Sequence, residues 1–177
     1  MVLYILMIHI EDYIRDIKDF PKPGIVFKDI TPLLANPKVS QACLEQLLVL
    51  VGDQKIDKVV GVEARGFFFG NTLAQQLNAG FIPVRKPGKL PHETLSESYQ
   101  LEYGTDSLEI HKDAIQKGDR VLVHDDVLAT GGTASAVCKL IENLGGTIVQ
   151  CNFLMVLDFL KGEEKLKPYP VTAILNY

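Results

Sequence analysis

The sequence predicts an α/β fold with a doubly wound, mostly parallel sheet. Short β-branched apolar runs, which are typical of buried strands, alternate with segments whose apolar residues recur at helical spacing. Residues 58–63, 67–78 and 81–85 have the order and spacing of a strand–helix–strand crossover. Residues 121–124 begin a second unit, in which a Gly-rich loop leads into a helical pattern at 134–144. Successive crossover units indicate that the strands run parallel and that helices cover the sheet.

The composition fits one folded domain. A chain of 177 residues with 47% hydrophobic and 23% charged residues can bury a full core, so we expect residues 1–177 to form a single domain. The net charge of −4 argues against binding of nucleic acid or membrane through bulk electrostatics, and an anionic substrate then requires a local cluster of Lys and Arg. Cys43, Cys138 and Cys151 lack metal-ligand spacing, which favours reduced core thiols in a cytoplasmic protein.

The first eight residues are apolar. They lack the basic segment and the small-residue cleavage site of a signal peptide, and they are too short to span a bilayer. We expect residues 1–8 to be either a small extension that packs on the body or the product of a start codon placed ahead of Met7.

Two helices and an extended segment are predicted before the first crossover. Residues 11–18 are expected to be helical because apolar side chains recur at helical spacing, namely Ile10, Tyr13, Ile14 and Ile17. The sequence FPKPG at 20–24 ends that helix, and residues 25–30 are expected to be extended. A helix is predicted for residues 37–51, with Pro37 in its first turn.

The rest of the chain adds a hairpin and two strands. After a polar stretch at 86–96, alternating residues flank a turn at Gly104-Thr105-Asp106, which predicts a β-hairpin that stands off the sheet. Gly145-Gly146 ends the second crossover helix. Strands are predicted at 148–157 and 171–175.

Three predicted loops follow strands whose C-terminal ends share one edge of the sheet, where ligands of such folds bind. The loops that follow Glu63 and Arg85 supply four cations, Arg65, Arg85, Lys86 and Lys89. The third loop has two carboxylates followed by a helix N-terminus with five small residues: Asp125, Asp126, Ala129, Thr130, Gly131, Gly132 and Thr133. Glycine N–H groups, Thr hydroxyls and the helix dipole all favour a phosphate there. The carboxylates suit ribose hydroxyls, so we expect a phosphorylated-sugar site that takes a polyphosphate with a divalent ion.

Each of these features also has a purely structural interpretation. The loop at 129–133 is a plausible turn, the acidic pair could solvate a strand end, Lys86 and its neighbours could be a solvated loop, and Arg65 could cap a helix. His124 is expected to be packed rather than catalytic, and Phe67-Phe68-Phe69 to be helix core or a subunit contact. Their joint occurrence favours a site, because all the structural explanations would have to hold at once. The motifs G-x-x-x-x-G-K-[ST], G-x-G-x-x-G and G-x-S-x-G are missing from the sequence, which excludes three common nucleotide and hydrolase sites.

Residues 121–133 resemble the phosphoribosyl-diphosphate signature of type I phosphoribosyltransferases. Further blocks resemble the branch of that family that uses adenine: DFPKPGIVFKDI at 19–30, GVEARGF at 61–67, residues 84–91, SYQLEYG at 98–104 and LKGEEKL at 160–166. The resemblance spans residues 12–177, with the blocks in the family's order. It implies a type I phosphoribosyltransferase-like fold with a small base-binding hood at residues 20–34 and a mobile hairpin lid at residues 87–104.

The same resemblance implies a purine salvage enzyme, a glycosyltransferase that moves the 5-phosphoribosyl group from phosphoribosyl diphosphate to adenine and yields AMP and pyrophosphate. It implies Mg²⁺ as cofactor, held mainly by the diphosphate and water with no direct side-chain ligation. It also implies a cytoplasmic homodimer without nucleic-acid or membrane partners.

The resemblance assigns roles to individual residues as well. Ala129, Thr130, Gly131, Gly132 and Thr133 would hold the 5′-phosphate. Asp125 and Asp126 would bind the ribose hydroxyls, and the pyrophosphate side would be bound by Arg65, Arg85 and Lys89. Val26 and Lys28 would contact adenine through backbone groups, with Phe27 against the ring. Glu102 and Tyr103 would be the active-site members of the lid, and with Arg65 they are the expected catalytic residues, Glu102 as the group that takes up the N9 proton.

Three residues depart from the family's pattern. Lys28 stands where Arg is common, His124 precedes the acidic pair in place of a small apolar or acidic residue, and His92 replaces a lid glycine. Two alternatives also stay open. One is transfer to hypoxanthine, guanine or xanthine, which the segment Val26-Phe27-Lys28 disfavours. The other is a regulator of the same fold that senses the diphosphate and binds nucleic acid or a partner, which a short acidic chain disfavours.

Overall fold

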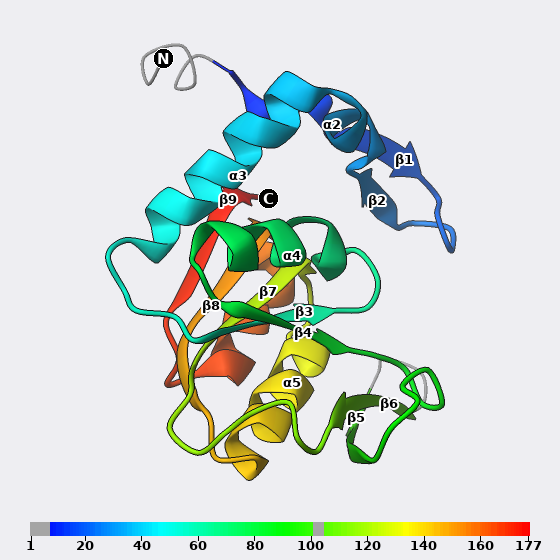
Figure 1. Ribbon diagram of the computed structural model, residues 1–177. Coiled ribbons are helices and arrows are strands. Elements are labelled where there is room, and N and C mark those ends of the chain that lie inside the picture. The colour runs from blue at the N-terminus through cyan, green and yellow to red at the C-terminus, as the bar shows by residue number, and fades with distance from the viewer. Residues whose placement is uncertain (1–7, 101–104) are drawn as a thin grey trace. The chain divides into compact units, whose positions relative to one another are not determined.

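The structure is a computed structural model that describes residues 8–100 and 105–177 (Figure 1). The chain divides into two compact units, Met1–Gln46 and Leu47–Tyr177. The single domain expected for residues 1–177, with its hood at 20–34 and lid at 87–104, stays a prediction. None of the described helices is both long enough and apolar enough to cross a membrane.

The first unit is built on a small antiparallel hairpin. Its elements are η1 (Ile10–Tyr13), β1 (Arg15–Lys18), β2 (Val26–Asp29), α2 (Thr31–Ala35) and the start of α3 (Pro37–Val51). The helix predicted for residues 11–18 is wrong, because the chain makes one 3₁₀ turn and then becomes extended at Ile14 (φ −98°, ψ 118°). Strand β1 then pairs with β2, with Ile17 opposite Phe27. A ladder of backbone hydrogen bonds outweighs helical periodicity in so short a segment.

The turn between β1 and β2 is stabilised by its own side chains. Gly24, at φ 85°, donates its N–H to Asp19 Oδ1 at 2.7 Å. The rings of Phe20 and Phe27 meet edge to face at 5.2 Å. The extended segment expected at 25–30 is confirmed as β2, whereas helix α2 was not predicted. The helix expected at 37–51 is confirmed as α3 with the same bounds.

The second unit contains the predicted parallel sheet. Its strand order is β4-β3-β7-β8-β9, and every neighbouring pair is parallel. The strands are β3 (Lys58–Val62), β4 (Gly80–Val84), β7 (Arg120–Leu128), β8 (Thr147–Val156) and β9 (Val171–Asn176). Helix α4 (Gly66–Gln76) connects β3 to β4, and α5 (Gly132–Asn143) connects β7 to β8. Figure 1 shows the two helices on opposite faces of the sheet. The doubly wound α/β fold is therefore confirmed.

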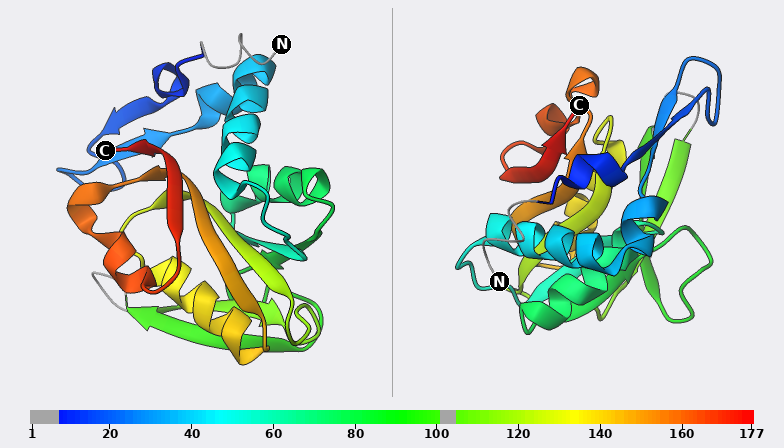
Figure 2. Two further views of the ribbon diagram at one scale, coloured as in Figure 1. Left: turned by 90° about the vertical axis from the view of Figure 1, so that its left-hand side faces the viewer. Right: turned by 90° about the horizontal axis from the view of Figure 1, so that it is seen from above.

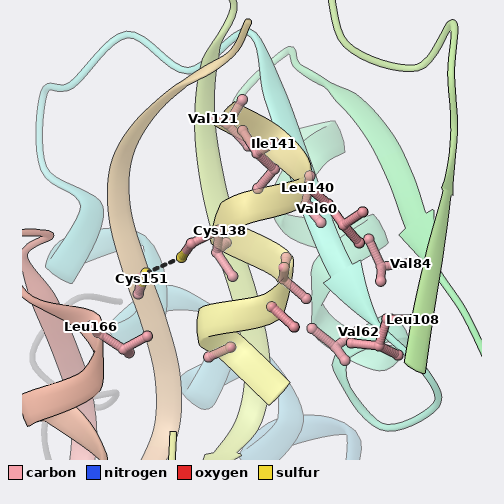
Figure 3. Packing of buried hydrophobic residues seen from close by; sticks show 14 of the residues in the cluster. Val60, Val62, Val84, Leu108, Val121, Cys138, Leu140, Ile141, Cys151 and Leu166 are labelled. Atoms are coloured by element: carbon pink, nitrogen blue, oxygen red, sulfur yellow. Dashed lines mark hydrogen bonds between the residues drawn. The ribbon is translucent and has the colours of Figure 1, made fainter. Parts of the chain in front are cut away.

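Successive side chains of β7 point to opposite faces of the sheet, and each face is covered by one helix. Val121 and Val123 belong to the core cluster that includes Leu140 and Ile141 of α5 (Figure 3). His124, one residue on, lies beside Gly70 of α4 instead. All three cysteines are buried and free, as predicted, and the Sγ atoms of Cys138 and Cys151 are 3.7 Å apart. Burial raises the pKa of Cys43 to about 12, so this thiol stays protonated.

The predicted hairpin is present as a separate two-stranded sheet of β5 (Thr94–Gln100) and β6 (Thr105–His111). Two of the predicted turn residues, Thr105 and Asp106, belong to β6 instead, since Asp106 pairs with Tyr99 in the ladder. The hairpin stands off the main sheet but is not detached from the body. Leu108 and Ile110 are buried in the core with α5, and Figure 2 shows the hairpin alongside that helix.

Strand β7 is longer than predicted. The acidic pair was expected where the strand ends, but the ladder with β8 continues past it to Leu128. Asp125 pairs in register with Phe153, and the side chain of Asp126 is buried. The Arg65 guanidinium lies beside this buried carboxylate, as described below. After β8 the chain forms two short 3₁₀ turns, η2 (Asp158–Leu160) and η3 (Gly162–Leu166), before β9.

Candidate active site

A small cavity lies at the loop that connects β7 to α5. Its volume is about 80 Å³, and it is lined by Asp125 and by the chain that follows: Val127, Leu128, Ala129, Thr130, Gly131, Gly132, Thr133 and Ala134. Gly131 is the N-cap of α5 and adopts φ 76°, a conformation that favours glycine. The unpaired N–H groups of the first helical turn and the helix dipole make such a cavity suited to an anion. The five predicted phosphate-binding residues thus line one cavity.

The loop is supported from behind by a glycine that the sequence argument did not single out. A Cβ placed on Gly162 would collide with the Ala129 carbonyl oxygen, and one placed on Gly131 would collide with the Gly162 carbonyl oxygen. The two backbones therefore approach as closely as glycine allows. Gly162 lies in the block LKGEEKL, but nothing in the sequence alone relates that block to residues 129–131.

The two predicted carboxylates have different surroundings. Asp126 is buried, and its Oδ2 lies 3.0 Å from Arg65 Nε at the start of α4. Asp125 is half-buried, and its Oδ1 accepts a hydrogen bond from the Asp126 N–H at 2.9 Å. Burial raises the pKa of both carboxyl groups. The charge of Asp126 raises the pKa of Asp125 further, whereas Arg65 opposes the rise for Asp126.

Gly66 allows α4 to approach the acidic pair. A Cβ on this residue would lie 2.8 Å from the His124 carbonyl oxygen and 3.0 Å from Asp125 Oδ1, so any side chain would push the helix away. The close approach brings Arg65, the residue before it, to Asp126. This is why the expected cation and the expected ribose ligand meet across two neighbouring strands.

The basic loop after β4 is organised by Glu63, which follows β3. Its carboxylate accepts hydrogen bonds from Arg85 Nε at 3.2 Å, from Arg85 Nη2 at 3.3 Å and from the Lys86 N–H at 2.9 Å. Arg85 Nη1 also donates to the Lys89 carbonyl oxygen at 3.2 Å. Burial acts to raise the pKa of Glu63, but these donors lower it, so the group stays ionised. Glu63 is a second positioning residue that no sequence pattern identified.

The three predicted strand-end loops therefore share one edge of the sheet. The order β4-β3-β7 makes the loops at Arg85, Glu63 and Asp125 neighbours. Arg65, Asp125, Asp126 and the loop at 129–133 form one continuous cluster. Arg85 and Lys89 lie with Glu63 beside it.

The remaining predicted residues belong to the first unit or fall outside the described residues. Val26, Phe27 and Lys28 are in β2 of the first unit, where Lys28 Nζ pairs with Asp16 Oδ1 at 2.8 Å. Glu102 and Tyr103 fall outside the described residues. Their roles stay predictions.

His124 is a packed, hydrogen-bonded histidine, as predicted. It is fully buried, and its Nδ1 lies 3.1 Å from Asn152 Oδ1. Asn152 Nδ2 in turn donates to Thr172 Oγ1 at 3.3 Å, which links β7, β8 and β9. Burial lowers the pKa of His124 to about 4, so the ring is neutral near pH 7. Its role here is structural, in the strand that carries the acidic pair.

The chain belongs to the phosphoribosyl transferase family. The family model, described as a phosphoribosyl transferase domain, matches residues 29–174. The adenine phosphoribosyltransferase of Flavobacterium johnsoniae is 70% identical over 168 residues, which is 95% of this chain and 99% of that relative.

Solved structures agree with this assignment. Adenine phosphoribosyltransferase from Rhodothermus marinus matches with a TM-score of 0.92 at 52% identity, and the match covers 100% of both chains. The Saccharomyces cerevisiae enzyme, crystallised with adenine and D-2,5-dideoxy-2,5-imino-altritol 1,6-bisphosphate, matches with a TM-score of 0.88 at 42% identity over 98% of this chain and 99% of that one.

Proposed function

We propose that the protein transfers the 5-phosphoribosyl group from phosphoribosyl diphosphate to adenine and releases AMP and pyrophosphate, as an enzyme of purine salvage. The observation that carries the proposal is the cavity of residues 125–134, with a helix N-terminus on one side and a carboxylate on the other. The relatives named as adenine phosphoribosyltransferases support adenine as the base.

Each part of phosphoribosyl diphosphate is proposed to bind groups that suit its charge. Cleavage of the anomeric C1–O bond builds positive charge on the ribose, which the carboxylates Asp125 and Asp126 stabilise as they bind its hydroxyls. Neutral amides of the loop at 129–133 hold the 5′-phosphate. Arg65, Arg85 and Lys89 neutralise the leaving pyrophosphate, whose charge increases as the bond breaks.

The base is proposed to bind at β2. Backbone groups of Val26 and Lys28 contact adenine, and Phe27 packs against its ring. The ion pair of the Lys28 ammonium with Asp16 supports a backbone role, because it engages the side chain elsewhere. Glu102 is proposed to take up the N9 proton and Tyr103 to assist it, on a lid that excludes water from the reactive diphosphate.

Mg²⁺ is the proposed cofactor. Among residues 8–100 and 105–177, His, Cys, Asp and Glu side chains nowhere form a group of three that could hold a metal ion. We propose that the diphosphate and water coordinate the ion, which is the usual arrangement with phosphate substrates. Bound in that way, the ion would neutralise charge on the pyrophosphate.

A product assay with each purine tests the proposal. The protein is incubated with phosphoribosyl diphosphate, Mg²⁺ and adenine, hypoxanthine, guanine or xanthine in turn, and nucleotide and pyrophosphate are measured. AMP formed from adenine alone supports the proposal. A nucleotide from another purine would instead define a different transferase. Diphosphate binding without any product would favour a regulator.

A further inference from the structure

The segment at 85–89, which follows β4, contains a tight turn. Lys89 donates its N–H to the Lys86 carbonyl oxygen at 3.3 Å, and Gly88 between them adopts φ 74°. Proline in the second position and a glycine with positive φ in the third are typical of a type II turn. Such a turn bonds its own first carbonyl and last N–H, so the N–H of Gly88 needs an acceptor from outside the turn.

Glu109 of β6 supplies that acceptor. Its Oε2 accepts the Gly88 N–H at 3.0 Å. Its backbone also pairs with Arg85, because the Glu109 N–H donates to the Arg85 carbonyl oxygen at 2.7 Å and the Arg85 N–H donates back at 2.9 Å. The neighbours Leu108 and Ile110 are buried in the core, so the Glu109 side chain lies on the other face of β6. One residue of the hairpin therefore holds the turn at its start and at its third position.

Two carboxylates together satisfy the N–H groups that the turn cannot satisfy itself. The Lys86 N–H donates to Glu63 Oε2 at 2.9 Å, and Glu109 takes the Gly88 N–H. With the backbone bonds given above, every N–H between residues 85 and 89 has an acceptor in the protein. The turn therefore meets an anion with its side chains, whereas the loop at 129–133 meets one with the amides of a helix N-terminus.

The closed turn also orients Arg85. A guanidinium has five N–H donors, of which the Glu63 carboxylate takes two and the Lys89 carbonyl oxygen one. Within the part of the chain that the structure describes, the other two are left for a ligand. Lys89 is the last residue of the turn, so its carbonyl stays beside Arg85 only while the turn is closed.

We propose that Glu109 is a positioning residue for the pyrophosphate group, whose carboxylate holds the turn at 85–89 closed and so keeps Arg85 and Lys89 in place before the substrate binds. The inference rests on the proposed function, because it takes these two cations as ligands of the pyrophosphate. The charge of Glu109 itself repels an anion, so its contribution comes through the hydrogen bond to Gly88. A turn that is already ordered binds more tightly because less order has to be created on binding.

The test compares Glu109→Ala, which removes the acceptor, with Glu109→Gln, whose amide oxygen still accepts a hydrogen bond. For Glu109→Ala we expect the Kd for pyrophosphate with Mg²⁺, measured by calorimetry, to rise about 3- to 10-fold, the loss typical of one intramolecular hydrogen bond. The KM for phosphoribosyl diphosphate should rise in proportion. The KM for adenine and the Kd for ribose 5-phosphate should stay within about twofold of wild type. Glu109→Gln should bind pyrophosphate at least as tightly as wild type.

Asp113→Ala is the matched control. It removes a carboxylate four residues further along the chain, where the Asp113 side chain is 73% exposed and lies 4.0 Å from His92 Nε2. This variant should keep the wild-type Kd for pyrophosphate, and thermal melts confirm that all three variants are folded.

Charge alone predicts the opposite result, because both Glu109 variants remove one negative charge and would then bind pyrophosphate more tightly. Tighter or unchanged binding by Glu109→Ala, or an equal loss in Glu109→Gln, would overturn the inference while the proposed function stands. Wild-type protein that binds no pyrophosphate and forms no AMP would overturn the proposed function, and the inference with it.

Discussion

Asp126 carries a buried carboxylate beside an arginine whose side chain is 36% exposed. Burial raises the pKa of this carboxyl group, and the neighbouring guanidinium opposes the rise. The guanidinium can turn to solvent or to a ligand, whereas the carboxylate cannot leave the strand. At the residue scale, then, the charge state of Asp126 depends on Arg65.

We therefore expect Arg65→Gln to move the acid limb of the pH–rate profile. Without the guanidinium the pKa of Asp126 rises, so the carboxylate is protonated at a higher pH and activity is lost at a higher pH than in the wild type. Turnover near pH 7 should fall at least about tenfold, since the variant also removes a charge proposed to bind pyrophosphate. The melting temperature should change by about 5 °C or less.

Arg120→Gln is the matched control for this prediction. Arg120 is at the other end of β7, where its Nε donates to the Lys55 carbonyl oxygen at 2.7 Å. This variant should keep the wild-type pH–rate profile. An unshifted acid limb in Arg65→Gln would show that Asp126 does not control activity.

His124 gives a second prediction at the residue scale. Its pKa is lowered to about 4 in the folded protein, whereas an unfolded histidine titrates near 6.5. The unfolded chain therefore binds a proton first, and the stability that neutral His124 contributes is lost as the pH falls from about 6.5 toward 4. Between pH 7 and pH 5 the loss should be about 2 kcal/mol.

Urea denaturation of His124→Gln at both pH values measures this loss. The variant cannot titrate at this position and keeps a polar group near Asn152, so its free energy of unfolding should fall by about 2 kcal/mol less than that of wild type. The raised pKa values of Asp125 and Asp126 affect both proteins alike. Equal losses in the two proteins would mean that His124 is accessible to protons in the folded state.

The phosphate loop and η3 form one unit at the scale of elements. Gly131 and Gly162 are in contact through their backbones, so the loop cannot move without the segment at 158–166. The cavity at the start of α5 therefore depends on a turn about 30 residues further along the chain. This dependence can be tested without altering any group that lines the cavity.

Gly162→Ala should weaken ribose 5-phosphate binding at least about tenfold, because the new Cβ displaces the Ala129 carbonyl and with it the loop amides. Gly118→Ala serves as the control. Gly118 has open space around it but adopts φ 88°, so the substitution should cost about 1 kcal/mol of stability and leave binding intact. Calorimetry and thermal melts of both variants separate the two effects. Unchanged binding by Gly162→Ala would show that the loop tolerates displacement.

At the scale of the whole molecule, strong local patterns predicted most of the fold. Helix α3 and the parallel strands were found because their apolar residues recur without interruption and Pro37 marks a helix start. The helix predicted at 11–18 was wrong, because antiparallel pairing with the strand Val26–Asp29 holds that segment extended. The three strand-end loops were predicted because parallel topology alone brings them to one edge. Glu63 and Gly162 were missed, because each acts through a partner at least about 20 residues away in the sequence.

Exposed apolar side chains on α3 and α4 provide a test of the homodimer that the family resemblance implies. Phe68 of α4 is 51% exposed, although its neighbour Phe69 is buried and Phe67 packs edge to face on Phe81. A large aromatic side chain exposed between two packed ones suggests a surface that another copy of the chain covers. Val49, which is 79% exposed on α3, offers a comparison on another helix.

We expect the wild type to have the mass of two 19.6 kDa chains in light scattering, and Phe68→Glu to have the mass of one. A carboxylate at the centre of an apolar contact loses its hydration when the two copies meet, which costs several kcal/mol and dissociates the pair. Val49→Glu places the same charge on α3 and should stay dimeric. Circular dichroism confirms that both variants are folded. A dimer that persists in Phe68→Glu would place the contact on another surface, whereas a monomeric wild type would refute the homodimer itself.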